Sequence, residues 1–286
     1  MNPRTNAMKT GLDRGWTEFK LSLKSPQDQG FYLFMAVVIL GYLWLNRSGE
    51  IEGAGITMST ATFAMPSILG ALIAFSLVIG PGYSLAMERE DGTLLRSKAV
   101  PHGMTGYVTG QVVLHSMSIL PMFLVILVPG MFLFDGLMQN GASGWATVIW
   151  VTLLGLLAAL PLGIILGSLV PSAQKMGTWG FFPIIGLTGV SGIFFPIQAL
   201  WEWVQVVAQV FPIYWLGLGM RSAFLPDAAA ALEIGGSWRT AETITVLALW
   251  AAAGLILAPR VLRRMARRQS GSQVEAAREA AVQWVR

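Results

Sequence analysis

The chain has 286 residues, of which 54% are hydrophobic and only 12% are charged. Soluble domains carry about 25% charged residues, so this composition excludes an ordinary soluble protein and indicates a membrane protein. The net charge of +4 does not indicate nucleic-acid binding, because the basic residues flank apolar segments, where lipid headgroups and membrane topology account for them. No cysteine is present, which excludes disulfide bonds and thiolate metal sites.

Residues 1–29 form a polar, charged segment without the features of a secretory signal peptide. Within it, Leu12, Trp16, Phe19 and Leu23 recur at helical spacing, and charged residues occupy the other side. This pattern predicts an amphipathic helix that lies in the headgroup plane of a membrane. A helix packed on a soluble partner has a similar pattern, but tryptophan and leucine opposite lysine and arginine favour the membrane surface.

Six apolar segments follow, and together they form a predicted transmembrane domain over residues 30–260. A helix needs about 20 residues to cross the hydrocarbon core, so the first segment is short and the third is long. Pro121 and Pro129 predict a kink or an early end in the third segment. The expected spans cover residues 30–45, 62–87, 105–134, 145–170, 176–195 and 241–258.

The loop after the second span, residues 88–103, is dense in charges of both signs although hydrophobic segments flank it. Gly92 is expected to end the preceding helix. The residues after it are expected to form a short helix across the membrane face, which ends at Pro101. An ordinary solvated turn is the alternative, but a turn needs only a few residues.

His115 falls inside the third span, and Gln111 lies one turn earlier on the same face. An ionisable group at that depth is a candidate functional site, but a neutral histidine bonded to a neighbouring helix is the interpretation we favour. Otherwise the spans carry essentially no charge, and the sequence contains neither the phosphate-binding pattern G-x-x-x-x-G-K-[ST] nor a metal-binding spacing. The chain is therefore not expected to be an enzyme or to bind a cofactor.

Residues 196–240 are apolar but too interrupted for a simple span. Pro196 and Pro212 bracket one part, in which apolar and polar residues line different faces. Backbone that enters a membrane without crossing it must lie against protein or a water-filled cavity. We interpret this segment as a re-entrant hairpin that forms an external gate, with Glu202 facing the exit; a plain interfacial helix fits equally well.

The lysines and arginines outside the spans predict the orientation. With both termini in the cytoplasm, sixteen of the 19 basic residues are cytoplasmic, and only Arg47, Arg221 and Arg239 are external. The acidic residues divide evenly, so the bias belongs to the basic residues, as the positive-inside rule requires. We therefore expect both termini on the cytoplasmic side of the plasma (inner) membrane, with residues 261–286 as a basic cytoplasmic tail.

Two motifs stand at fixed places relative to these spans. The first is Glu88-Arg89-Glu90-x-Gly92-Thr93-Leu94, which follows the second span and precedes Pro101; the second runs from Ser191-Gly192-Ile193-Phe194-Phe195-Pro196 to Phe211-Pro212-Ile213-Tyr214 and Arg221. With the amphipathic N-terminal helix, this order resembles the permeases of ABC type-2 transporters. Arg96, Ser97 and Lys98 replace a leucine pair frequent in that family, which leaves the partner ATPase and the substrate open.

The resemblance implies an all-α polytopic membrane protein with six transmembrane helices, an N-terminal interfacial amphipathic helix and a re-entrant helical hairpin before the last span. It also implies two permease copies, identical or related, and a separate ATP-binding subunit that holds ATP and magnesium. Glu88, Arg89, Glu90, Gly92, Thr93 and Leu94 would then transmit the ATP-driven movement. The second and fifth spans would line the substrate pathway, with candidates Phe63, Met65, Ser67, Thr188, Ser191 and Phe194.

The implied function is ATP-driven export of a hydrophobic or amphiphilic substrate, as in multidrug and natural-product efflux. Two other classes remain open at this stage. An ion-coupled secondary transporter or channel needs no ATPase, but the absence of carboxylates inside the spans argues against it. A membrane anchor or sensor that recruits a partner through the same loop would form a complex without ATP-dependent flux.

Overall fold

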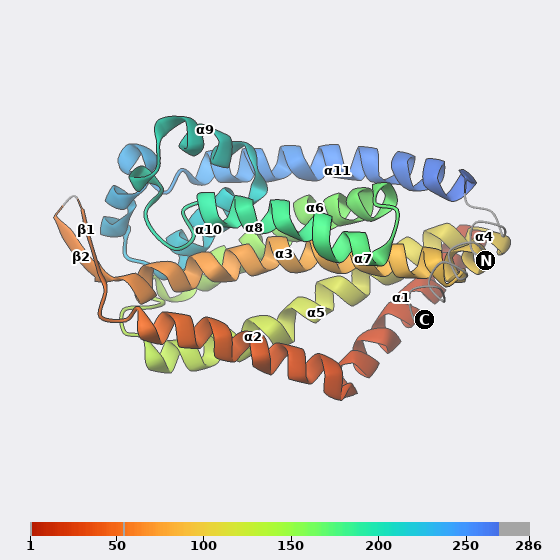
Figure 1. Ribbon diagram of the computed structural model, residues 1–286, viewed down its shortest axis with the longest axis horizontal. Helices are drawn as coiled ribbons and strands as arrows, with labels where there is room; N and C mark the ends of the chain where they lie inside the picture. Colours follow the sequence, from red (N-terminus) through yellow and green to blue (C-terminus); the bar gives the residue numbers. More distant parts are fainter. Residues whose placement is uncertain (1, 54, 269–286) are drawn as a thin grey trace, which may run out of the picture.

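The computed structural model describes residues 2–53 and 55–268, most of which are helical (Figure 1). Its elements are α1 (Pro3–Lys24), α2 (Pro26–Leu45), β1 (Glu50–Gly53), β2 (Ile56–Ser59), α3 (Thr60–Glu90), α4 (Thr93–Ala99), α5 (Gly103–Leu133), α6 (Gly141–Leu169), α7 (Ala173–Lys175), the π-helical turn η1 (Met176–Gly180), α8 (Phe181–Val190), η2 (Ile197–Ala199), α9 (Glu202–Val210), α10 (Pro212–Phe224), η3 (Asp227–Leu232), η4 (Ile234–Gly236) and α11 (Thr240–Arg268).

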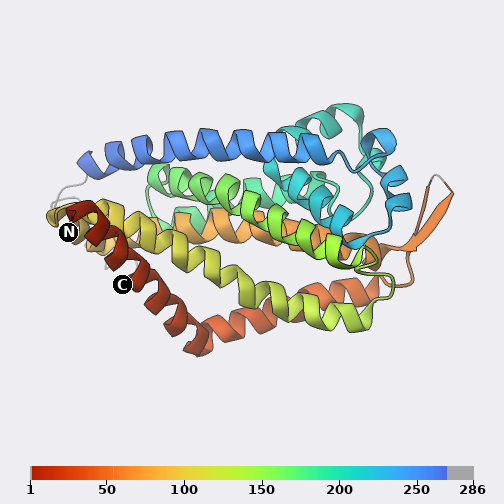
Figure 2. The same ribbon diagram turned by 180° about the vertical axis from the view of Figure 1, so that it is seen from behind.

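The long helices run side by side in an elongated bundle with two distinct ends (Figures 1 and 2). The α4 end carries α4, the start of α1 and the last turns of α11. The opposite end, called the hairpin end, carries the antiparallel strands β1 and β2, in which Ile51 pairs with Met58. This strand pair was not predicted.

Among the residues that the structure describes, five helices are long and apolar enough to cross a membrane, namely α2, α3, α5, α6 and α11. The pair α9 and α10 passes the same test together, but the chain bends by 91° between them. This helical architecture confirms the prediction of an all-α polytopic membrane protein.

Several predicted boundaries were wrong. The fifth apolar segment, expected over 176–195, is helical only from α7 through η1 to the end of α8, because Gly192 adopts a left-handed conformation with φ of +65° just beyond Val190. Pro121 and Pro129 do not end α5, because neighbouring groups can satisfy the carbonyls that a proline frees in a membrane helix. The last helix continues past 258 to Arg268; residues 269–286 of the predicted tail lie outside the described residues.

Helix α3 is the centre of the bundle, and 78% of its most apolar window is buried. Helix α6 crosses it closely because Gly163 and Gly167 carry no side chain. A Cβ atom on Gly163 would lie 2.6 Å from the carbonyl oxygen of Val78, and one on Gly167 would lie 2.5 Å from that of Gly82. Small residues that let helix backbones approach are a common basis of packing in membranes, where lipid offers the same apolar contacts.

Helices α9 and α10 leave the hairpin end and return to it. The side-chain amide of Asn140, in the loop before α6, donates to the carbonyls of Ser222 and Leu225 at the end of α10, both at 2.9 Å. On the other side, Gln198 before α9 donates to the carbonyl of Glu233 at 2.7 Å. Because both ends are fastened to the same end of the bundle, the segment is a re-entrant hairpin rather than a span.

Helix α1 packs on α5 with a different face from the one its sequence suggests. Gly11 and Gly15 lie against the α5 backbone, so closely that a side chain on either would clash. Of the predicted apolar stripe, only Phe19 is buried, whereas Leu12 and Trp16 are each 48% exposed and Leu23 is also exposed. The exposed part of the stripe therefore remains available to a membrane surface or a partner.

Candidate functional site

The loop after α3 contains a short helix, as predicted. Gly92 has φ of +82°, a left-handed conformation that glycine adopts without strain, and it separates α3 from α4. The backbone N–H of Thr93 bonds to Asp91 Oδ1 at 2.7 Å, and Leu94 is completely buried against the bundle. Val100 is extended before Pro101, which ends α4. A small helix is thus anchored across the α4 end of the molecule.

The charged residues before Gly92 join α3 to three other elements. Glu88 Oε1 lies 3.0 Å from Arg14 Nη2 on α1, and Arg14 also pairs with Glu18 at 2.6 Å. Arg89 Nη2 donates to the carbonyl of Val170 after α6 at 2.5 Å. Glu90 Oε1 accepts a 3.0 Å hydrogen bond from the first backbone N–H of α7, that of Ala173. These half-buried residues therefore connect helices within the chain.

The surface of this loop consists of other residues. Asp91, Arg96, Ala99, Val100, Pro101 and His102 are exposed, whereas Glu88, Arg89, Glu90, Thr93 and Leu94 are half-buried or buried. Arg96 lies on the outer side of α4, two residues after buried Leu94. Helical periodicity around Leu94 could have identified this outer face from the sequence. A docking partner would touch Arg96 before it touched the charged motif.

A chain of polar side chains runs from Glu88 along α5. Gln111 Nε2 lies 3.4 Å from Glu88 Oε1, and His115 Nε2 lies 2.9 Å from Gln111 Oε1. Gly80 on α3 faces His115, and a Cβ atom there would lie only 2.8 Å from Nδ1. The structure thus pairs Gln111 with His115 as expected and adds Glu88 to them.

These side chains border a cavity of about 670 Å³ between α1, α2, α3 and α5. Tyr32, Met35 and Phe75 give it an apolar wall, and His115 and Gln111 give it polar groups. Ligand cavities in proteins are typically of this size, with mostly apolar walls and a few polar groups.

The predicted pathway residues do not form an open lining. Phe63, Met65, Ser67 and Ser191 are buried, whereas Thr188 and Phe194 are half-buried. Ser67 lies against α10, where it bonds to Arg221, and Met65 lies against Gly130 of α5. The four buried residues therefore line no open surface in this conformation of the chain, and their place on a substrate pathway stays a prediction.

The proposed gate residues are not gathered at one site. Glu202 is the exposed first residue of α9, where a carboxylate interacts favourably with the helix N-terminus. Pro212 is the buried first residue of α10, and half-buried Pro196 precedes η2. The sequence named Arg221 only as part of a motif and as an external basic residue, and Glu233 was not named. An ionisable residue within an apolar segment was the signal for this enclosed pair.

Within residues 2–53 and 55–268, no three histidine, aspartate or glutamate side chains are grouped to hold a metal ion. In a comparison with protein-family models, the one for the ABC-2 type transporter matches residues 12–225. The chain belongs to the ABC-2 type transporter family. A comparison with curated proteins gives no match.

The ABC-2 match begins within α1 and ends just after α10. It therefore includes α4, the charged residues before it and the re-entrant hairpin. Membership confirms the resemblance found in the sequence and makes the chain a multi-pass permease component of an ABC transporter.

Proposed function

We propose that this ABC-2 permease exports a hydrophobic or amphiphilic substrate. Separate ATP-binding subunits that dock at its α4 end supply the energy. The observation that supports this most directly is the construction of α4. It is separated from α3 by left-handed Gly92, anchored by buried Leu94 and exposed at Arg96. A partner that presses on α4 would move α3, and α3 is the centre of the bundle.

The contacts of Glu88, Arg89 and Glu90 suggest how movement spreads. A displacement of the end of α3 would act on α1 through Arg14, on the end of α6 through the Val170 carbonyl, and on α7 through its first N–H group. Rigid-body movement of packed helices is an established way to open and close a site. In this proposal ATP and magnesium bind only to the partner subunits, and the permease performs no bond chemistry.

The charge distribution supports a cytoplasmic α4 end. Arg96 and Lys98 lie on α4, and Arg263, Arg264 and Arg267 lie on the last turns of α11. The positive-inside rule places such clusters in the cytoplasm. Both termini would then lie on the side where ATP-binding subunits reside, and the hairpin end would face outward across the plasma (inner) membrane.

A second permease copy is expected along α8. Trp179, Phe182 and Ile185 are all exposed and recur at helical spacing on the η1–α8 segment. Large apolar side chains on one side of a helix suit either lipid or another protein surface. We place the partner copy there and the substrate pathway between the two copies, bordered by half-buried Thr188 and Phe194. The cavity beside His115 supports a hydrophobic or amphiphilic substrate, since Tyr32, Met35 and Phe75 give it an aromatic and methionine wall.

The test is co-purification of the permease with its ATPase, followed by measurement of substrate-stimulated ATP hydrolysis. Arg96→Ala should reduce the amount of ATPase retained, because it removes an exposed cation from α4. Arg89→Ala should retain the ATPase but reduce transport, because it removes the bond between α3 and the end of α6. Arg47→Ala, which changes an exposed arginine between α2 and β1 at the hairpin end, serves as the control.

Unchanged retention and transport in both variants would contradict the role given to α4. Sidedness has a separate test, since the chain has no cysteine. A single cysteine at Arg96 should react with a membrane-impermeant thiol reagent only from the cytoplasmic side; reaction in intact cells would end the proposal.

A further inference from the structure

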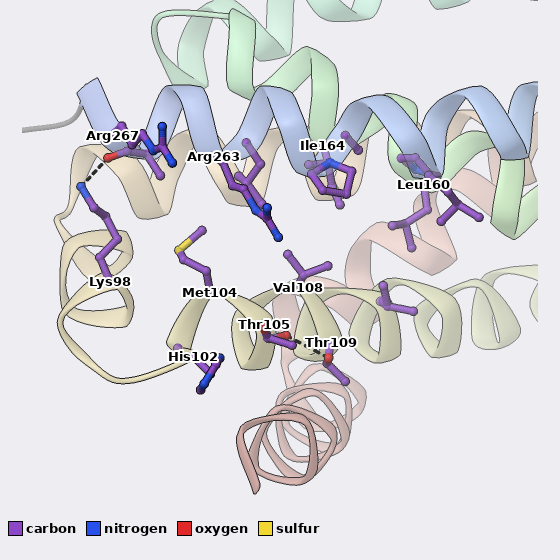
Figure 3. Close-up of a pocket in the computed structure, with 18 of the residues that line it drawn as sticks. Lys98, His102, Met104, Thr105, Val108, Thr109, Leu160, Ile164, Arg263 and Arg267 are labelled. Atoms are coloured by element: carbon purple, nitrogen blue, oxygen red, sulfur yellow. Dashed lines mark hydrogen bonds between the residues drawn. The ribbon is translucent and has the colours of Figure 1, made fainter. Parts of the chain in front are cut away.

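A second pocket lies at the α4 end between α5 on one side and α6 and α11 on the other (Figure 3). Its volume is about 530 Å³. Figure 2 shows these three helices on one face of the bundle. Helix α8 lies on the opposite face, which is the front face in Figure 1. The pocket is therefore separate from both the cavity beside His115 and the proposed position of the second copy.

The mouth of this pocket is cationic. Lys98, Arg263 and Arg267 line it together with His102, and none of the described lining residues is acidic. Figure 3 shows Arg263 reaching from α11 into the space toward α5, while Lys98 approaches the end of α11, where it donates to the carbonyl of Ala266. Three permanent cations around one opening favour an anionic group there.

The remainder of the pocket is apolar and opens sideways. Val108 and Val112 line it from α5, and Leu160, Ile164 and Leu255 line it from the opposite helices. Val112 is 40% exposed and Leu255 is 54% exposed, so the apolar part faces the surroundings of the bundle, where lipid chains lie. A pocket with a cationic mouth and an apolar interior suits an amphiphile with an anionic head.

The length of the pocket fits one lipid leaflet. From Gly103 to Val112, α5 rises about 14 Å at about 1.5 Å per residue. Half of a hydrocarbon core is about 15 Å thick. A headgroup at the cationic mouth therefore leaves room for an acyl chain along α5 without crossing the membrane midplane.

We infer that this pocket binds an anionic glycerophospholipid from the leaflet at the α4 end. Its phosphate lies among Lys98, Arg263 and Arg267, and one acyl chain follows Val108 and Val112 toward the centre of the membrane. The lipid bridges the last turns of α11 to α4 and the start of α5. This inference depends neither on the direction of transport nor on the ATPase.

The experiment uses the full-length permease purified in a neutral detergent. It is titrated with dioleoyl phosphatidylglycerol or with dioleoyl phosphatidylcholine, which has the same chains and a zwitterionic head, and bound lipid is counted by native mass spectrometry. Each basic residue near an anionic lipid surface contributes on the order of fivefold in affinity. Phosphatidylglycerol should therefore bind at least roughly tenfold more tightly than phosphatidylcholine.

Matched variants separate this pocket from general surface attraction. Arg263→Gln should weaken phosphatidylglycerol binding about fivefold, whereas Arg264→Gln, which changes the neighbouring exposed arginine outside the pocket, should leave it within about twofold. Val112→Trp fills the apolar part and should also weaken binding; Leu120→Trp, on an exposed position of α5 outside the pocket, should not.

Equal binding of the two lipids would overturn the inference, as would equal losses in Arg263→Gln and Arg264→Gln. Displacement of phosphatidylglycerol by an equal concentration of glycerol phosphate would assign the pocket to a small soluble phosphate instead. If phosphatidylglycerol bound only after deletion of residues 269–286, the pocket of the full chain would be assigned to those residues instead of a lipid. Loss of ATPase binding with normal lipid binding would leave the inference intact.

Discussion

Arg221 and Glu233 form an ion pair that protein encloses completely: Nε lies 2.6 Å from Oε1, and both side chains are 0% exposed. The guanidinium also donates to Ser67 Oγ at 2.8 Å and to the carbonyl of Gly192 at 3.0 Å, and it lies over the ring of Phe63. These bonds fasten the re-entrant α10 to α3, to the end of the α8 segment and to the connection before α11.

Removal of one member of this pair should destabilise the permease strongly. Glu233→Ala leaves the buried Arg221 cation without its carboxylate, which costs about 3–5 kcal/mol. We expect a large fall in apparent melting temperature in detergent. Glu242→Ala removes an exposed carboxylate that pairs with Arg239 and should cost at most about 1 kcal/mol. Similar melting temperatures for the two variants would show that the buried pair is dispensable.

The left-handed conformation of Gly92 predicts a graded response to substitution. Gly92→Val introduces a β-branched side chain where φ is +82°, which costs roughly 1–2 kcal/mol and should displace α4. Asparagine tolerates this conformation, so Gly92→Asn should retain more transport. The measurement is substrate-stimulated ATP hydrolysis of both variants at equal expression. Higher activity in the valine variant would contradict the backbone argument.

Gly15 predicts a steric effect on α1. Gly15→Leu would push α1 away from the backbone of Gly110 on α5 and separate Arg14 from Glu88. The cost should be about 1–3 kcal/mol, and trypsin should cleave faster at Lys20 within the displaced helix. Gly30 on α2 has no atom in the way of a Cβ, so Gly30→Leu is the matched control. Equal cleavage rates would mean that close packing does not hold α1.

The polar chain along α5 predicts that Gln111 matters more for stability than His115. Gln111→Leu removes the group between Glu88 and His115 and should cost about 1–3 kcal/mol, because buried polar atoms lose partners. His115→Leu removes one hydrogen bond, at the last member of this row of polar side chains, and should cost about 1 kcal/mol with transport unchanged. Melting temperature and substrate flux test both. Loss of flux with normal expression of His115→Leu would give this histidine a role in transport.

Features that depend on local chemistry were predictable. Gly92 and Pro101 mark the limits of α4 because glycine permits a left-handed turn and proline ends a short helix. Long apolar runs gave most of the membrane helices for a similar reason, since their length must match the hydrocarbon core. Pro121 and Pro129 do not end α5, because in a membrane helix surrounding groups can satisfy the backbone that proline leaves free.

The sequence by itself determined that this is a polytopic membrane protein, roughly where most of its membrane helices lie and where the charged loop carrying α4 lies. Only the tertiary structure decided which side of each helix is buried: Gly15 rather than Leu12 on α1, and Ser67 beneath α10 rather than beside an open path. The physical reason is that lipid, rather than water, surrounds the membrane helices. Lipid is as apolar as a protein core, so hydrophobicity does not distinguish the buried face of a membrane helix. Close backbone approach at glycines and long-range bonds such as that between Arg221 and Glu233 make that distinction, and both depend on residues far apart in the chain.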